Sequence, residues 1–277
     1  MHIDIHLPGH AEVVVAIKPE FAVGSIDESG WAYVAELAAA AGANRRQLIK
    51  TGPMSAPRGE SMVSIRSGRV LLEGILELPL NPSGVVAFSH GSGSGRHSPR
   101  NRYVARELQA AGLATLLLDL LTPEEDQDYE MRFDIELLTG RLADAVRFLR
   151  EHAATQALPV GLFGASTGAA SALRVAAAML GDIKAVVSRG GRPDLAGHEA
   201  LPLVRAPTLL IVGGRDHGVI ELNQAAYDRM RCVKEIKIVP GATHLFEEAG
   251  ALEQVAGLAV DWFSRHLAGE DGRSAGK

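Results

Sequence analysis

Three residues whose types together perform nucleophilic catalysis lie in the second half of the chain. Ser166 sits in a Gly-x-Ser-x-Gly stretch that follows an apolar run and precedes an alanine-rich run, and Asp216 and His244 each follow a later apolar run. A histidine can take the proton of a serine, and an aspartate can fix the imidazole tautomer and stabilise its charged form. Ser166, Asp216 and His244 are therefore the predicted catalytic residues, with Ser166 as the nucleophile.

The glycines around Ser166 indicate why this serine would be exposed. Gly164 and Gly168 flank it where a sharp strand-to-helix turn leaves no room for a Cβ atom. An ordinary strand-to-helix connection packed with small residues would look the same in a chain with 30 glycines. The suitable partners downstream favour the catalytic interpretation.

Attack by a serine creates an oxyanion that needs backbone N–H donors. One predicted donor is the amide of Thr167, beside the nucleophile at a helix N-terminus, where the peptide dipoles favour negative charge. The other is the amide of Ser92, in the glycine-rich stretch 90–95 that follows a short apolar run. A phosphate-binding loop is the alternative for that stretch, but the Lys-Ser/Thr ending of a P-loop is absent.

Basic residues near these stretches are candidates for substrate binding. Four of them crowd the start of a predicted helix: Arg96, His97, Arg100 and Arg102. Cations there oppose the helix dipole, so an anionic substrate or an acidic segment would explain them. The acidic loop 122–133 could simply neutralise them. Arg189 and Arg192 follow another apolar run and are either pocket residues or ordinary solvated side chains. The predicted substrate-binding residues are Arg96 and Arg189.

Strands and helices alternate from residue 62 onward. A hairpin is predicted at 62–66 and 69–78, followed by strands at 84–89, 113–120, 158–163, 183–188, 208–212 and 235–239 and helices at 103–111, 135–152, 168–180, 221–231 and 251–267. Near-continuous apolar strands separated by helices indicate an α/β fold, with a mostly parallel sheet covered on both faces. Ligands of such sheets gather at the C-terminal ends of the strands, where all three predicted catalytic residues fall.

The first 60 residues are predicted to form a separate extension. Apolar alternation at Ile3, Ile5 and Leu7 and the run 12–18 predict strands, and 31–41 predicts a helix. A Pro- and Gly-rich stretch then marks a boundary near residue 60. The predicted domains are the extension 1–60, the α/β domain 61–268 and a disordered tail 269–277.

The composition excludes several partners. A net charge of −5 and a pI near 6.1 argue against nucleic-acid binding. A single cysteine, Cys232, cannot form an internal disulfide. No apolar stretch approaches the roughly 18 residues of a membrane helix, and the N-terminus lacks a basic start with an apolar run. We therefore expect a cytoplasmic protein without a membrane partner.

Residues 62–267 resemble an α/β-hydrolase of the dienelactone hydrolase group. Four segments carry the resemblance: 88–95, 163–168, 188–194 and 240–244. The Ser, Asp, His chain order is also that of the α/β-hydrolase triad. The resemblance implies the α/β-hydrolase fold and the hydrolysis of an ester or lactone without a metal or cofactor. Dienelactone hydrolases proper use a cysteine nucleophile where this chain has Ser166, so their lactone substrate is not carried over.

Residues 19–50 resemble a fragment of a type I phosphoribosyltransferase domain. The acidic pair and Thr-Gly-rich loop with which that family holds phosphoribosyl pyrophosphate are absent, and about 60 residues are too few for the whole nucleotide fold. We predict a remnant or cover without transferase activity.

The predicted function is that of a serine hydrolase that cleaves a small-molecule carboxylic ester or lactone through an acyl-enzyme, and an anionic substrate is one option. Two alternatives remain open. The chain could be a noncatalytic scaffold or binding module that keeps the fold, since fold alone does not establish activity. The same three residues could also act on a thioester or a small amide.

Overall fold

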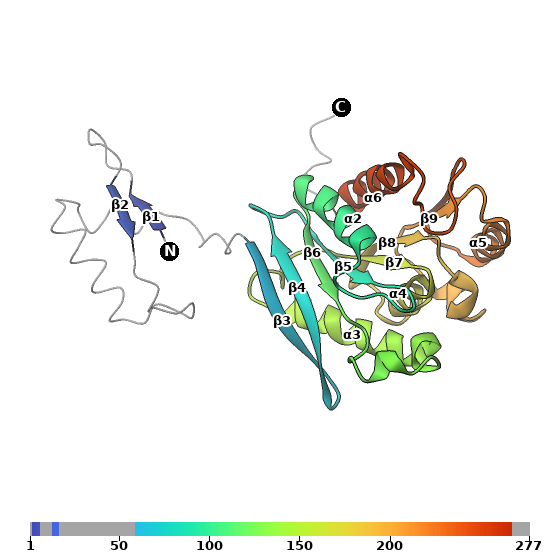
Figure 1. Cartoon of the computed structure of the whole chain (residues 1–277), viewed down its shortest axis with the longest axis horizontal. Helices are drawn as coiled ribbons and strands as arrows, with labels where there is room; N and C mark the ends of the chain where they lie inside the picture. Colours follow the sequence, from blue (N-terminus) through green and yellow to red (C-terminus); the bar gives the residue numbers. More distant parts are fainter. Residues whose placement is uncertain (1, 6–12, 17–58, 268–277) are drawn as a thin grey trace. The chain divides into compact units, whose positions relative to one another are not determined.

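A computed structural model describes residues 2–5, 13–16 and 59–267, and the chain divides into two compact units, Met1–Met54 and Ser55–Lys277 (Figure 1). In the first unit, β1 (His2–Ile5) pairs with β2 (Val13–Ala16) in antiparallel register. Strands were predicted at both places. The helix predicted at 31–41, the phosphoribosyltransferase-like segment 19–50 and the tail 269–277 lie outside the described residues.

The second unit is built on an eight-stranded sheet in the order β10-β9-β8-β7-β5-β6-β4-β3. Its strands are β3 (Gly59–Ser67), β4 (Val70–Leu78), β5 (Val85–Ser89), β6 (Ala114–Leu118), β7 (Val160–Ala165), β8 (Ile183–Arg189), β9 (Thr208–Gly213) and β10 (Lys234–Val239). The strands from β5 to β10 pair in parallel, and β3 and β4 form an antiparallel edge. Every residue of β5, β6, β7 and β9 is buried, as expected for a parallel sheet covered on both faces.

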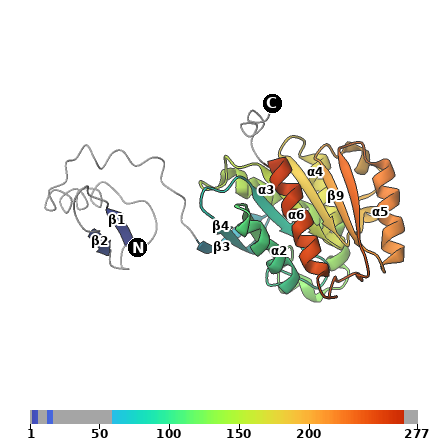
Figure 2. The same cartoon turned by 90° about the horizontal axis from the view of Figure 1, so that it is seen from above.

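Five α-helices cover the sheet: α2 (Pro99–Ala110), α3 (Ile135–Glu151), α4 (Thr167–Ala178), α5 (His217–Arg229) and α6 (Ala251–Leu267). Apolar residues of α2 and α6 form one core cluster, and those of α3, α4 and α5 belong to another, so the two sets cover opposite faces (Figures 1 and 2). None of the helices that the structure describes is long and apolar enough to cross a membrane.

Two helices begin earlier than the sequence predicted. Helix α2 begins at Pro99 rather than 103, because Ser98 caps it by accepting a hydrogen bond from the backbone N–H of Asn101 and proline suits the first helical position. Helix α5 begins at His217 rather than 221, directly after Asp216. In α2 the apolar periodicity starts only after the first turn, and in α5 the first turn contains Gly218, a poor helix former, so the sequence pattern places both helix starts too late.

Candidate active site

Ser166 lies in a strained turn between β7 and α4. Its φ of 50° and ψ of −121° are unusual for a residue with a side chain. Neighbouring backbone holds this geometry: the Ser166 N–H donates to the carbonyl of Arg189 (3.1 Å), and the Ser166 carbonyl accepts from the N–H of Arg192 (3.0 Å). A Cβ atom on Gly164 would lie 2.5 Å from Ala169 Cα, so only glycine fits before the turn. The turn leaves Ser166 partly exposed.

A hydrogen-bond chain joins the three predicted catalytic residues. His244 Nε2 lies 3.3 Å from Ser166 Oγ, and His244 Nδ1 lies 2.6 Å from Asp216 Oδ2. A carboxylate on Nδ1 holds the ring proton there, which leaves Nε2 free to accept the serine proton. The arrangement matches the geometry of a nucleophile, a base and a residue that orients the base.

Close backbone contacts bring His244 and Asp216 to the same edge of the sheet. Asp216 follows β9, and His244 lies in the loop after β10. A Cβ atom on Gly213 would lie 2.5 Å from the carbonyl oxygens of Ala242 and Thr243, so the end of β9 packs directly against the histidine loop. A side chain at Gly213 would push the two loops apart.

The glycine-rich loop after β5 reaches the nucleophile. A Cβ atom on Gly91 would lie 3.0 Å from Ser166 Cβ. The Ser92 N–H donates to Thr167 Oγ1 at 3.0 Å. Thr167 is the first residue of α4, where backbone N–H groups have no partner within the helix. Both predicted oxyanion donors therefore lie beside Ser166.

The buried His90 links this loop to the neighbouring strand. The backbone N–H of Leu120 donates to His90 Nε2 at 2.9 Å, and His90 Nδ1 lies 2.9 Å from the carbonyl oxygen of Gly91. Burial lowers the pKa of His90 below its usual value. Sequence reasoning missed this residue, although its place between a buried strand and a glycine-rich loop was a signal.

Arg96, one of the two predicted substrate-binding residues, is held by two carboxylates. Its guanidinium forms ion pairs with Asp119 and Glu73, and its backbone N–H donates to Asp119 Oδ1 at 2.6 Å. These contacts fix the end of the glycine-rich loop against β4 and β6. They leave Arg96 a poor candidate for binding a substrate anion.

The acidic loop 122–133 does not neutralise the basic cluster, so that alternative was wrong. Glu125 pairs with Arg141 at 2.7 Å, and Asp126 pairs with Arg132 at 3.0 Å. Arg100, from the basic cluster, pairs instead with Glu247 at 3.1 Å. Glu125 therefore anchors the loop to α3, and the pair of Asp126 with Arg132 lies within the loop itself.

Arg189, the other predicted substrate-binding residue, is buried without a carboxylate. It ends β8 and is 7% exposed. Its guanidinium carbon lies 5.9 Å from the ring centre of Phe246, and one terminal nitrogen lies 3.5 Å from Asn101 Oδ1, the outer limit of a hydrogen bond. Burial, with a smaller effect of Arg100, lowers the pKa of Arg189 to about 10. Among the described residues, no carboxylate forms an ion pair with it.

Two further polar residues near the site were not predicted. Asn101 is buried in the first turn of α2, beside Arg189. Asn223 is buried in α5, and its amide donates to the carbonyl of Gly191 at 2.9 Å, which ties α5 to the segment after β8. Arg192, in that segment, pairs with Asp194 at 2.7 Å.

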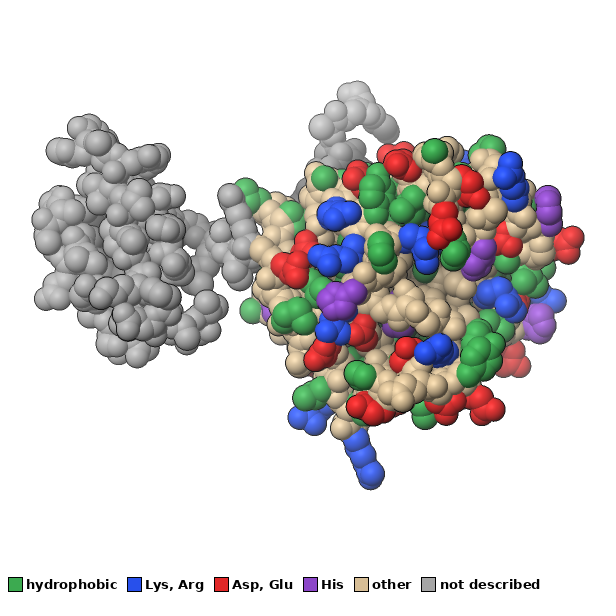
Figure 3. Space-filling model, in the orientation of Figure 1, with side chains coloured by type: hydrophobic (Ala, Val, Ile, Leu, Met, Phe, Trp, Pro, Cys, Tyr) green, Lys and Arg blue, Asp and Glu red, His purple; other side chains and the backbone are tan. Residues whose placement is uncertain are grey.

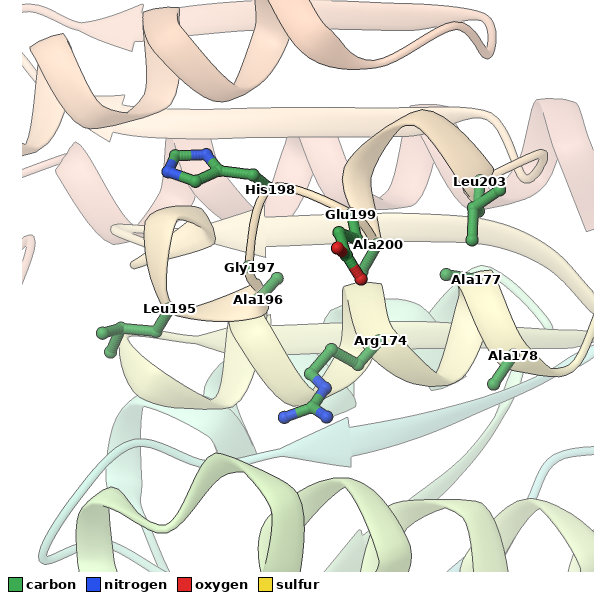
Figure 4. Close-up of a pocket in the computed structure, with 10 residues that line it drawn as sticks. All are labelled: Arg174, Ala177, Ala178, Leu195, Ala196, Gly197, His198, Glu199, Ala200 and Leu203. Carbon is green, nitrogen blue, oxygen red and sulfur yellow. The ribbon is translucent and has the colours of Figure 1, made fainter.

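A hollow of about 540 Å³ lies beside α4 (Figure 4). It is formed by α4 and the short helices η4 (Pro193–Ala196) and η5 (Leu201–Leu203). Its lining residues are Arg174, Ala177, Ala178, Leu195, Ala196, Gly197, His198, Glu199, Ala200 and Leu203. None of the three predicted catalytic residues lines it.

Charges of both signs are interspersed over the molecular face that Figure 3 shows.

The sheet, its helical layers and the serine turn define an α/β-hydrolase. Within that class, the chain belongs to the dienelactone hydrolase family, because the model of the "Dienelactone hydrolase family" matches residues 73–266.

Solved structures of similar proteins support the assignment. A dienelactone hydrolase from Anabaena variabilis ATCC 29413 is 54% identical and covers 76% of this chain and 98% of its own, with a TM-score of 0.74. Est1E from Butyrivibrio proteoclasticus covers 75% of this chain and 99% of its own with a TM-score of 0.64, but at 16% identity it shows the fold alone.

Curated relatives carry two different names. A "Putative phosphoribosyl transferase" of Mycobacterium tuberculosis (strain H37Rv) is 57% identical over 213 residues, which are 77% of this chain and 48% of that protein. This chain therefore spans about half the length of that relative. A "Probable 2-oxo-3-(5-oxofuran-2-ylidene)propanoate lactonase" of Bradyrhizobium sp. is 29% identical over 166 residues, which are 52% of this chain and 66% of that protein.

Proposed function

We propose that the chain is a serine hydrolase that cleaves a carboxylic ester or lactone through an acyl-enzyme on Ser166. The observation that carries the proposal is the hydrogen-bond chain from Ser166 Oγ through His244 to Asp216, with the serine held in a strained turn. Membership of the dienelactone hydrolase family supports it.

The reaction uses groups that already face one another. His244 Nε2 takes the proton of Ser166 as Oγ attacks the substrate carbonyl, and Asp216 stabilises the imidazolium that forms. The Thr167 and Ser92 amides stabilise the oxyanion, for which the Ser92 N–H exchanges its bond to Thr167 Oγ1. The imidazolium then protonates the leaving alkoxide, and a water activated by the same imidazole hydrolyses the acyl-enzyme.

An alkyl fluorophosphonate tests the nucleophile directly, because it forms a stable mimic of the tetrahedral intermediate. We expect one label per chain, located on Ser166 by peptide mass spectrometry. Ser166→Ala should abolish both labelling and the hydrolysis of an activated aryl ester, while Ser94→Ala, in the glycine-rich loop, should leave both intact. A wild-type protein that takes no label and cleaves no activated ester would support the scaffold alternative. Cleavage of thioesters or amides in preference to esters would support the other alternative.

We propose further that the substrate carries a carboxylate, which Arg189 binds. A buried guanidinium without an anion is costly, because desolvation removes its water and only the Phe246 ring and a hydrogen bond to Asn101 at the outer limit of length replace it. A substrate carboxylate would satisfy it near the catalytic residues, since the guanidinium lies against the ring of Phe246, two residues after His244. The name of the Bradyrhizobium relative, a propanoate lactonase, agrees with an anionic substrate.

Matched substrates test the charge of the substrate. We expect a half-ester of a short dicarboxylic acid to be cleaved with a higher kcat/KM than its neutral diester. Arg189→Met should lower kcat/KM for the half-ester by about 10- to 100-fold, corresponding to a charge-assisted hydrogen bond of about 1.5–3 kcal/mol, and leave the diester nearly unchanged. Arg192→Gln is the matched control, because that side chain pairs with Asp194. Equal loss for both substrates would refute carboxylate binding without touching the hydrolase assignment.

A further inference from the structure

The hydrogen bonds of the buried His90 determine which of its ring nitrogens carries the proton. Nε2 receives the backbone N–H of Leu120 at 2.9 Å, so this nitrogen must offer a lone pair. The proton is therefore on Nδ1, which donates it to the carbonyl oxygen of Gly91, 2.9 Å away. Burial lowers the pKa of the imidazole and favours this neutral form.

The Gly91 carbonyl belongs to the same peptide unit as the Ser92 N–H. A trans peptide is planar, and its C=O and N–H point in opposite directions. Fixing the carbonyl on the side of His90 therefore turns the Ser92 N–H to the other side, where it meets Thr167 Oγ1 at 3.0 Å beside Ser166.

This peptide needs an external constraint because its neighbours allow rotation. Gly91 and Gly93 lie on either side of Ser92, and glycine adopts several backbone conformations at little cost. The Ser94 N–H also donates to the Gly91 carbonyl, at 3.2 Å, but this bond lies within the same glycine-rich turn. His90 is different, because its ring is bonded to the N–H of Leu120, in the segment that follows β6.

We infer that His90 is a positioning residue that orients the Ser92 amide for the oxyanion. The inference rests on the proposed serine hydrolase activity. In this role His90 neither contacts the substrate nor transfers a proton. It acts only by fixing the orientation of the peptide unit between Gly91 and Ser92. The competing interpretation is that His90 merely joins the ends of β5 and β6 through its bond from Leu120.

Two amide substitutions separate these interpretations. In His90→Asn, the side-chain nitrogen takes the place of Nδ1 and can donate to Gly91 but cannot reach Leu120. In His90→Gln, the side-chain oxygen takes the place of Nε2 and can accept from Leu120 but leaves the Gly91 carbonyl without that donor. We expect His90→Asn to keep kcat within about 3-fold of wild type. His90→Gln should lower kcat by about 10- to 100-fold with little change in KM, somewhat less than the loss of a whole oxyanion donor.

The reverse order, with His90→Asn impaired and His90→Gln normal, would show that only the link to β6 matters. Equal losses of kcat in the two variants, matched by equal losses of thermal stability, would likewise overturn the inference.

A readout without turnover keeps this inference separate from the proposed function. Nitrogen NMR of the wild-type protein should show His90 protonated on Nδ1 alone, and the Ser92 amide resonance should move in His90→Gln but stay near its wild-type position in His90→Asn. A wild-type protein that cleaves no ester would contradict the hydrolase proposal only. A Ser92 amide unmoved by His90→Gln would contradict the role of His90 even in an active enzyme.

Discussion

At the scale of single residues, the imidazole of His244 works only in one tautomer. The Asp216 carboxylate, 2.6 Å from Nδ1, holds the ring proton on that nitrogen. In Asp216→Asn, the amide could donate to Nδ1 and stabilise the tautomer in which Nε2 carries the proton and cannot act as a base. We expect kcat to fall by roughly 10⁴, as in other triads of this type. Asp194→Asn, which removes a carboxylate whose ion pair among the described residues is with Arg192, should lower kcat by less than about 3-fold and serves as the control.

The charge of Arg189 gives the proposed specificity a pH dependence. Its pKa, lowered to about 10 by burial, means that the guanidinium is charged below pH 10 and loses its proton above it. The ratio of kcat/KM for a carboxylated substrate to that for its neutral ester should therefore stay constant between pH 7 and 9 and fall above about pH 10. A ratio that falls already between pH 7 and 9, where the guanidinium is charged, would contradict the role of Arg189. Arg189→Met should abolish the pH dependence of the ratio.

At the scale of elements, two glycines should respond in opposite ways to the same substitution. A Cβ atom on Gly168 would collide with the carbonyl oxygens of Ser89 and His90, because α4 packs directly onto the end of β5. Gly140 is an exposed residue of α3 whose Cβ position is open. Gly140→Ala should raise the free energy of unfolding by about 0.5–1 kcal/mol. Gly168→Ala should lower it by more than about 1 kcal/mol, as overpacking does. Urea unfolding measures both.

The order and type of the elements were predictable, whereas the starts of α2 and α5 and the ion-pair partners were not. A continuous apolar run such as that of β7 indicates a strand buried on both faces, because such a strand has no polar residues in alternation. The start of α5 at His217 was missed because Gly218, a poor helix former, lies in its first turn. Arg96 was predicted to bind substrate because charge is visible in a sequence, but its carboxylate partners come from segments that only the folded sheet brings near. The three catalytic candidates were predictable from the Gly-x-Ser-x-Gly pattern around Ser166 and from their positions after strands β7, β9 and β10.

At the scale of the whole molecule, the transferase name of the mycobacterial relative raises the question whether this chain binds phosphoribosyl pyrophosphate, which is separate from the hydrolase site. The sequence lacks the acidic pair and Thr-Gly-rich loop that hold phosphoribosyl pyrophosphate. We therefore expect calorimetric titration of the full chain to show no binding of phosphoribosyl pyrophosphate at micromolar concentrations. Micromolar binding that disappears when residues 1–54, the first compact unit, are deleted would show that the extension retains a nucleotide site.

The strained turn at Ser166 has a consequence for the stability of the whole fold. A backbone with φ of 50° and ψ of −121° suits glycine, and a side chain there costs about 1–3 kcal/mol. Ser166→Gly removes that strain, although glycine also gains about 0.4–1 kcal/mol of entropy in the unfolded chain. We expect the inactive Ser166→Gly variant to unfold at a higher urea concentration than wild type. Ser166→Ala, equally inactive but with its Cβ retained, should not gain in this way.

If both substitutions behaved alike, the turn would hold no strain that a glycine could release. If they differ as expected, the residue that gives activity at position 166 lowers the stability of the fold. A search for more robust variants of this protein that monitors folding alone would then select molecules without a nucleophile. Any such search has to score turnover and resistance to unfolding together.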